Sequence, residues 1–286
     1  MHKPSTAVGY ADAPTSLVRS TCLYVATKLG DMMDDLVIVG GLVPSLIIDQ
    51  EDLPRGATAH VGTMDLDVGL SVALLDQERY KSVSDRLRSA GFGPDLNASG
   101  NPSRQRWVIG REAKVTVDFL IEPTLSDDCG GKIRDFERDF AAFIMPGLGL
   151  AFEDQIHVSL SGKTLYGESA TRTVRVCGPG AYVVLKALAL KNRGQNKDAY
   201  DLFYVLRNFG SGYTDVASRL APLLRNEHAS EAIAFLEANF TQLDHLGPMR
   251  VAEFLVGGPN DEIQADALGF VAGLLGEVER RSRGGQ

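Results

Sequence analysis

Three aspartates in strand-like surroundings are the residues of this sequence best suited to chemistry. Asp65 and Asp67 lie in the apolar run 63–68, and Asp118 lies in the run 115–120. Because successive side chains of a strand alternate between its faces, Asp65 and Asp67 share one face and can hold one or two divalent ions. Burying carboxylates among apolar residues is unfavourable unless a cation pairs with them. The three residues therefore predict a magnesium site and metal-dependent chemistry on a phosphate group.

A pair of glycines closes an earlier apolar run. Gly40 and Gly41 follow residues 36–39, and a helical pattern begins at residue 42. Without side chains, a turn lets backbone N–H groups approach a phosphate, and the positive end of the next helix favours anions. A tight turn is the structural alternative. The order of two glycines, Asp-x-Asp and a later Asp favours phosphate binding.

A second set of charged residues lies in a helical part of the sequence. Lys186 and Arg193 share one face of a helix, and Asp198 and Asp201 share a face of the next. Fixed cations suit phosphoryl chemistry, because they stabilise the negative charge of a transferring group. A salt-bridged pair of helices explains the same residues structurally. The segment therefore carries either a phosphate-binding face or an internal network of ion pairs.

The hydrophobic periodicity predicts an α+β fold, in which a mixed sheet with flanking helices precedes a helical C-terminal domain. The expected strands are 36–39, 65–70, 107–110, 114–121, 155–160 and 173–176. The expected helices are 16–33, 42–49, 76–90, 181–191, 197–208, 213–224, 229–238, 249–255 and 261–281. We therefore expect a flexible leader over residues 1–15, an α/β domain over 16–178 and a helical domain over 179–286.

Composition limits the classes of protein to which this chain can belong. With 286 residues, of which 44% are hydrophobic and 23% charged, it has the composition of a globular protein. Its formal charge of −8 argues against a surface that binds nucleic acid throughout, but allows local basic patches. Three cysteines without metal-ligand spacing favour a cytoplasmic protein. No apolar run is long enough to cross a bilayer, so we expect no membrane partner.

Three further features have two interpretations each. The four basic residues between positions 104 and 114 form either a local basic patch or the solvated edge of a hairpin. His60 either contacts a phosphate or is solvated in its loop. Trp107 either packs in the core beside the sheet or stacks on a base.

The glycine pair, the Asp-x-Asp at 65–67 and Asp118 together resemble the nucleotidyltransferase superfamily related to DNA polymerase beta. The pattern of that superfamily is Gly-Gly or Gly-Ser, then Asp-x-Asp, then a later Asp. Lys186, Arg193 and the Lys-Asp-x-x-Asp segment 197–201 narrow the resemblance to the AbiEii branch, which includes the MenT-type toxins of toxin–antitoxin systems. The segment between the glycines and the Asp-x-Asp is longer here than in compact forms of the motif.

This resemblance implies Mg²⁺-dependent transfer of a nucleotidyl group from a nucleoside triphosphate to an acceptor hydroxyl, which in toxin members is the 3′ end of tRNA. Asp65, Asp67 and Asp118 would be metal ligands and catalytic residues, and Gly40 and Gly41 would cradle the triphosphate. Further catalytic roles would fall on Lys186 and Asp198, and further nucleotide contacts on Lys186, Arg193 and Lys197. A cognate antitoxin would be the protein partner.

One alternative is another enzyme activity, and a second belongs to a different functional class. Transfer to a small molecule or a protein would share the first motif, but transfer to a small molecule would have less use for the Lys/Arg helix. A non-catalytic relative would bind nucleotide or a partner protein, but unused buried carboxylates only destabilise a fold. We therefore expect a nucleotidyltransferase toxin with an RNA acceptor.

Overall fold

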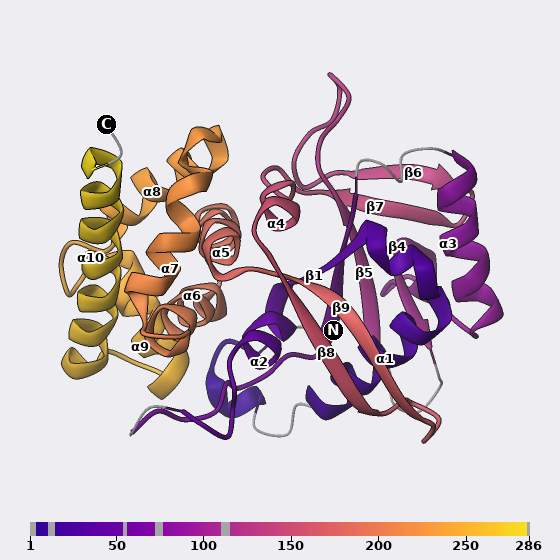
Figure 1. Ribbon diagram of the computed structural model, residues 1–286, viewed down its shortest axis with the longest axis horizontal. Helices are drawn as coiled ribbons and strands as arrows, with labels where there is room; N and C mark the ends of the chain where they lie inside the picture. Colours follow the sequence, from indigo (N-terminus) through magenta and orange to yellow (C-terminus); the bar gives the residue numbers. More distant parts are fainter. Residues whose placement is uncertain (1–3, 11–14, 54–55, 72–76, 110–114, 285–286) are drawn as a thin grey trace. The chain divides into compact units, whose positions relative to one another are not determined.

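The computed structural model describes residues 4–10, 15–53, 56–71, 77–109 and 115–284 (Figure 1). Its contacts divide the chain into two compact units, each of which is described by itself. The sheet unit comprises residues 14–43 and 62–177, and the helical unit comprises residues 1–13, 44–61 and 178–286. Residues 44–61 therefore belong with the C-terminal helices, although they lie within the range of the expected α/β domain.

A mixed nine-stranded sheet forms the centre of the sheet unit, among the residues that the structure describes. The main path runs β3-β4-β5-β2-β1-β9-β8, and β7 pairs with both β5 and β6. The pairs β1–β9, β2–β5 and β5–β7 are parallel, and the others are antiparallel. The strands are β1 (Leu36–Val39), β2 (Asp65–Leu70), β3 (Gly93–Leu96), β4 (Pro102–Ile109), β5 (Val115–Ile121), β6 (Ile133–Glu137), β7 (Phe140–Ile144), β8 (Gln155–Lys163) and β9 (Ser169–Cys177).

Aromatic and aliphatic side chains fill the core of the sheet unit. The core interpretation of Trp107 is confirmed, because its side chain is fully buried and packs edge-on against Phe119 and Phe140.

Helix α1 (Thr15–Leu29) lies against β8, β9, β2 and β5 (Figure 1). Two further α-helices of this unit, α3 (Gln77–Ser89) and α4 (Leu150–Glu153), contact β6 and β1 respectively.

The helical unit is built from helices that bury one side against their neighbours. Helix α5 contacts α6, α7 and α8, and α10 contacts α6, α7 and α9 (Figure 1). These helices are α5 (Pro179–Arg193), α6 (Asn196–Asn208), α7 (Tyr213–Leu220), α8 (Glu227–Asn239), α9 (Leu246–Val256) and α10 (Asp261–Gly284). Within the described part of the chain, no helix is both long and apolar enough to span a membrane.

The structure confirms a mixed sheet and a helical C-terminal region, and it refines several elements. The expected helix at 42–49 is a 3₁₀ turn at Gly40–Leu42 followed by the short α2 (Val43–Ile47). The strand expected at 107–110 begins earlier, at Pro102, and residue 110 lies outside the described residues. In the expected leader, Ala7–Tyr10 form a 3₁₀ helix whose last residue packs on Phe254 of α9.

Candidate functional site

The three predicted carboxylates of the sheet unit come together. Strands β2 and β5 pair in parallel, and their register sets Asp67 beside Asp118 and Asp65 beside Thr116. One oxygen from each of Asp65, Asp67 and Asp118 lies within 4.8 Å of the others. Oxygen ligands at this spacing suit a hard divalent cation. This group, which we call the carboxylate triad, could therefore hold a metal ion.

Alternation along the two strands explains why these side chains share one face. Leu66 and Val68 of β2 are fully buried, as are Val117 and Phe119 of β5, so the residues between them point to the other side of the sheet. Asp65 and Asp118 are nevertheless only 5% exposed. The hydroxyl of Thr63 donates a hydrogen bond to Oδ1 of Asp65 at 2.9 Å.

Arg106 is a fourth member of this site, and sequence analysis did not assign it there. Strand β4 pairs with β5 so that Arg106 lies opposite Asp118. Its Nε donates to Oδ1 of Asp118 and its Nη2 donates to Oδ2, both at 2.6 Å. The hydrogen bonds to Asp118 outweigh burial and raise the pKa of Arg106. Interpreting the basic stretch as a solvated edge is thus wrong for Arg106, because a neighbouring strand supplies its counter-ion.

The first glycine of the pair is required by the triad itself. Gly40 has a φ of +72°, which disfavours any residue with a side chain. A Cβ atom at this position would lie 1.9 Å from Oδ2 of Asp67. Strand β1 brings the two together, because its register with β2 pairs Val39 with Asp67. Gly40 thus leaves the space that the Asp67 carboxylate fills, a role that differs from the expected phosphate cradle. Gly41 is buried beside it.

Charged residues of the helical unit form a network between α5 and α6 that is buried except at Arg193. Nζ of Lys186 lies 2.6 Å from Oδ2 of Asp201 and 3.2 Å from Oδ1 of Asp198. Lys197 reaches Oδ1 of Asp201 at 2.7 Å, one helical turn away. Arg193 binds Asp198 through two hydrogen bonds of 2.7 Å each. We call these five residues, together with His60, the buried ion network.

Opposite charges set the protonation states in this network. Burial opposes the charge of Lys186, but Asp201 and Asp198 outweigh it and raise its pKa. Burial likewise disfavours the ionised carboxylates, yet Lys186 is the main cause of a lowered pKa at both Asp198 and Asp201. For Lys197, burial dominates and lowers the pKa. The geometry is that of the salt-bridged helix pair that the sequence offered as the structural interpretation.

His60 belongs to the same network, so its interpretation as a solvated loop residue is wrong. Its side chain is fully buried, and Nε2 lies 2.9 Å from Oδ1 of Asp201. The ring stacks on Tyr200 and meets Tyr204 edge-on. Burial lowers the pKa of His60 to about 4, so the ring is neutral near pH 7. Because a carboxylate only accepts hydrogen bonds, we assign the proton to Nε2, which donates to Asp201.

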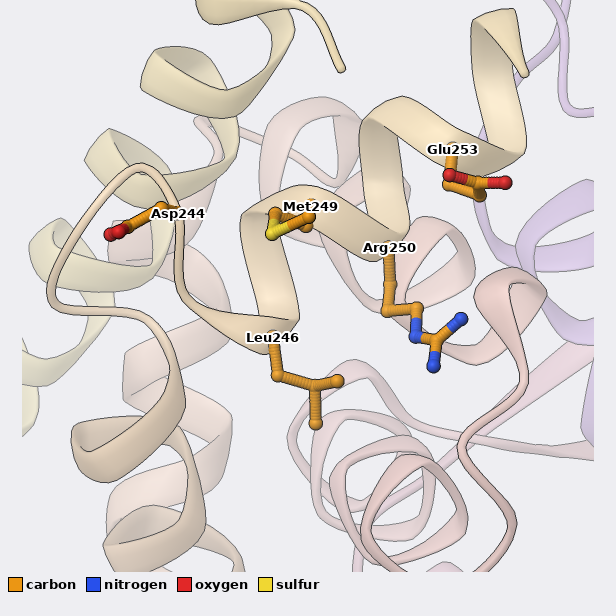
Figure 2. Close-up of a pocket in the computed structure, with 5 residues that line it drawn as sticks. All are labelled: Asp244, Leu246, Met249, Arg250 and Glu253. Carbon is orange, nitrogen blue, oxygen red and sulfur yellow. The ribbon is translucent and has the colours of Figure 1, made fainter. Parts of the chain in front are cut away.

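The helical unit also carries a cavity that no residue of this network lines. It has a volume of about 420 Å³ and is lined by Asp244, Leu246, Met249, Arg250 and Glu253. Figure 2 shows four of these side chains projecting from α9 and that of Asp244 projecting from the loop before it. None of the residues predicted from the sequence lines this cavity. Arg250 donates a hydrogen bond to Asn196.

The predicted residues therefore fall into two groups. The sheet unit brings together Asp65, Asp67, Asp118 and Gly40, and the helical unit brings together Lys186, Arg193, Lys197 and Asp198. Local spacing in the sequence did not indicate that Arg106 lies at the triad or that His60 is buried. The Arg106 contact depends on the register of β4 against β5, and the His60 contact joins residues far apart in the sequence.

No protein-family model matches the chain, and no curated protein matches it.

Proposed function

We propose that this protein is a divalent-metal-dependent nucleotidyltransferase whose metal ligands are Asp65, Asp67 and Asp118. The observation that carries the proposal is the convergence of three carboxylates from two adjacent, parallel strands, with an oxygen of each within 4.8 Å of the others. The donor set fits Mg²⁺, which prefers carboxylate oxygens, phosphate oxygens and water. Gly40 supports the same conclusion, because a side chain at this position would overlap the Asp67 carboxylate. The turn after β1 therefore helps to keep Asp67 in the triad.

The chain's own residues would divide the chemical work as follows. Asp65 and Asp67 would hold the cation from one strand, and the hydroxyl of Thr63 orients Asp65 through its hydrogen bond. Asp118 would be the third ligand and would also accept the proton of the attacking hydroxyl, as the hydroxyl oxygen bonds to the α-phosphorus and pyrophosphate leaves. When bound, magnesium would neutralise the triphosphate and stabilise the charge that develops during in-line displacement.

Within the helical unit, Arg193 is the residue of the buried ion network best suited to contact a phosphate. The side chain of Arg193 is 47% exposed, whereas those of Lys186 and Lys197 are 9% and 11% exposed. A guanidinium also suits phosphate better than an ammonium, because it binds two oxygens at once. In this proposal Asp198 orients Arg193, and Lys186 is a positioning residue that holds Asp198 and Asp201 in place.

We further propose that the acceptor is RNA, at the 3′ end of tRNA, and that the protein is the toxin of a toxin–antitoxin pair. The resemblance in the glycine pair, the Asp-x-Asp, Asp118 and the Lys-Asp-x-x-Asp segment supports this finer assignment. The negative formal charge of −8 fits a transient encounter with RNA better than tight binding. A cognate antitoxin would then neutralise the activity.

The test is transfer of label to RNA. The full chain is incubated with Mg²⁺, each labelled nucleoside triphosphate in turn and total tRNA, and the products are resolved on a denaturing gel. Asp67→Ala should abolish labelling, because it removes a metal ligand. The control is Asp135→Ala, which removes a carboxylate of β6 that pairs with Arg104.

The outcomes separate the components of the proposal. Label on tRNA from the wild type and Asp135→Ala, but not from Asp67→Ala, supports the whole proposal and names the donor. Equal labelling by Asp67→Ala would contradict the metal-ligand assignment. If no triphosphate labels tRNA, the RNA acceptor is wrong, and release of pyrophosphate with small hydroxyl compounds then tests transfer to a small molecule.

A further inference from the structure

Arg106 binds Asp118, one of the carboxylates that would coordinate the proposed metal ion. Its guanidinium binds both oxygens of Asp118, each at 2.6 Å. The side chain of Asp118 is 8% exposed, so this contact is largely shielded from water. The charges of Asp65 and Asp67 also act on Arg106, although less than Asp118 does. Arg106 is therefore a counter-cation built into the carboxylate triad.

Three carboxylates within 4.8 Å repel one another, and a nearby positive charge offsets that repulsion. A divalent ion would offset the same repulsion more strongly, because it carries twice the charge. The ion and the guanidinium would repel each other, and both would bind the same carboxylate oxygens of Asp118. The arginine side chain is 32% exposed, so its guanidinium can turn toward water without opening the core.

We propose that Arg106 and the divalent ion compete for Asp118, so that binding of the metal releases the guanidinium from this carboxylate. Arg106 thus sets the metal affinity of the site and stabilises the triad when no metal is bound. This inference rests on the proposed function, because it takes Asp118 to be a metal ligand. It goes beyond that function by giving the chain a residue that opposes metal binding.

A positioning role for Arg106 predicts the opposite sign. If the arginine only oriented Asp118 for the metal, its removal would leave the carboxylate misplaced and weaken metal binding. If the arginine competes, its removal strengthens metal binding. The direction of the change in metal affinity therefore separates the two roles without any measurement of activity.

The chain offers a matched control on the same strand. Arg104 lies two positions before Arg106 on β4. It pairs at 2.9 Å with Asp135 rather than with the triad, and both of these side chains are substantially exposed. Arg104→Gln therefore removes the same charge from the same strand while leaving the Asp118 contact intact.

The experiment is a calorimetric titration of the full chain with Mn²⁺ at constant ionic strength. The wild type, Arg106→Gln and Arg104→Gln are compared, and circular dichroism establishes that each is folded. We expect Arg106→Gln to bind Mn²⁺ more tightly by on the order of tenfold. Arg104→Gln should stay within about twofold of the wild type. In EDTA, Arg106→Gln should also unfold at a lower temperature, and Mn²⁺ should raise that temperature more than in the wild type.

Each other outcome has a definite meaning. Weaker binding by Arg106→Gln, or a change no larger than that of Arg104→Gln, would overturn the competition while leaving the metal site in place. Binding of Mn²⁺ by Arg106→Gln alone supports the competition in its strongest form. No binding by any variant would overturn both this inference and the proposed function. If Arg106→Gln does not fold, Arg106→Lys replaces it, with a smaller gain in affinity expected because one ammonium cannot bind both oxygens.

Discussion

The replacement Gly40→Ala tests whether the glycine pair serves the carboxylate triad. Two separate costs are expected. The residue has a φ of +72°, and a left-handed conformation costs an alanine about 1–2 kcal/mol. The new Cβ would also lie 1.9 Å from Oδ2 and 2.7 Å from Cγ of Asp67, so the carboxylate would have to move. Such overpacking costs about 1–3 kcal/mol.

The expected total is therefore a loss of about 2–5 kcal/mol in the free energy of unfolding. Gly131→Ala is the matched control, because Gly131 has a φ of +79° and no atom within 4 Å of the position of its new Cβ. It should lose only the conformational part, about 1–2 kcal/mol. Unfolding in urea, followed by circular dichroism in EDTA, gives both values.

Metal binding provides the second measurement on the same variants. Displacement of Asp67 should weaken Mn²⁺ binding by Gly40→Ala, whereas Gly131→Ala should bind as the wild type does. Equal losses of stability in the two variants would show that the overlap with Asp67 is relieved without cost. Unchanged Mn²⁺ affinity in Gly40→Ala would refute the argument that the glycine serves the triad.

Two further predictions concern the buried ion network. Burial lowers the pKa of His60 to about 4, so the unfolded chain takes up this proton at a higher pH than the folded chain, and stability should fall by about 3 kcal/mol between pH 7 and pH 4. Urea unfolding across this range should show that His60→Gln lacks this part of the loss, whereas His157→Gln, at an exposed position of β8, keeps it. Lys186→Met should cost about 3 kcal/mol, because it leaves Asp198 and Asp201 buried with fewer cations. Lys191→Met removes an exposed ion pair with Glu231 from the same helix and should cost at most about 1 kcal/mol. Equal losses of stability in the two variants would contradict the argument that the Lys186 ion pairs contribute more because they are buried.

Local patterns in the sequence predicted the parts of the site that lie on single elements. Two-residue alternation placed Asp65 and Asp67 on one face of β2, and helical spacing placed Lys186 and Arg193 on α5. The same patterns predicted the helical C-terminal region and the mixed sheet. These features depend on side chains only a few positions apart, so their geometry follows from the backbone of one strand or helix.

Contacts between distant segments required the tertiary structure. Asp118 meets Asp67 and Arg106 only because β5 pairs with β2 on one side and with β4 on the other, each in one register. Register follows from the packing of whole strands and from the length of the loops between them, which no short pattern records. These two pairings make the basic residue Arg106 the partner of Asp118, a predicted metal ligand.

Residue types and their spacing were enough to predict which side chains could do chemistry and which elements carry them. The tertiary structure decided which of them have partners: His60 is buried on Asp201, Lys186 is held by two carboxylates, and Gly40 makes room for Asp67. The physical reason is that burial and pairing of charges depend on every segment that packs around a group. The residue type limits the chemistry that a side chain can perform. The tertiary environment of the side chain then sets its protonation state and its contacts.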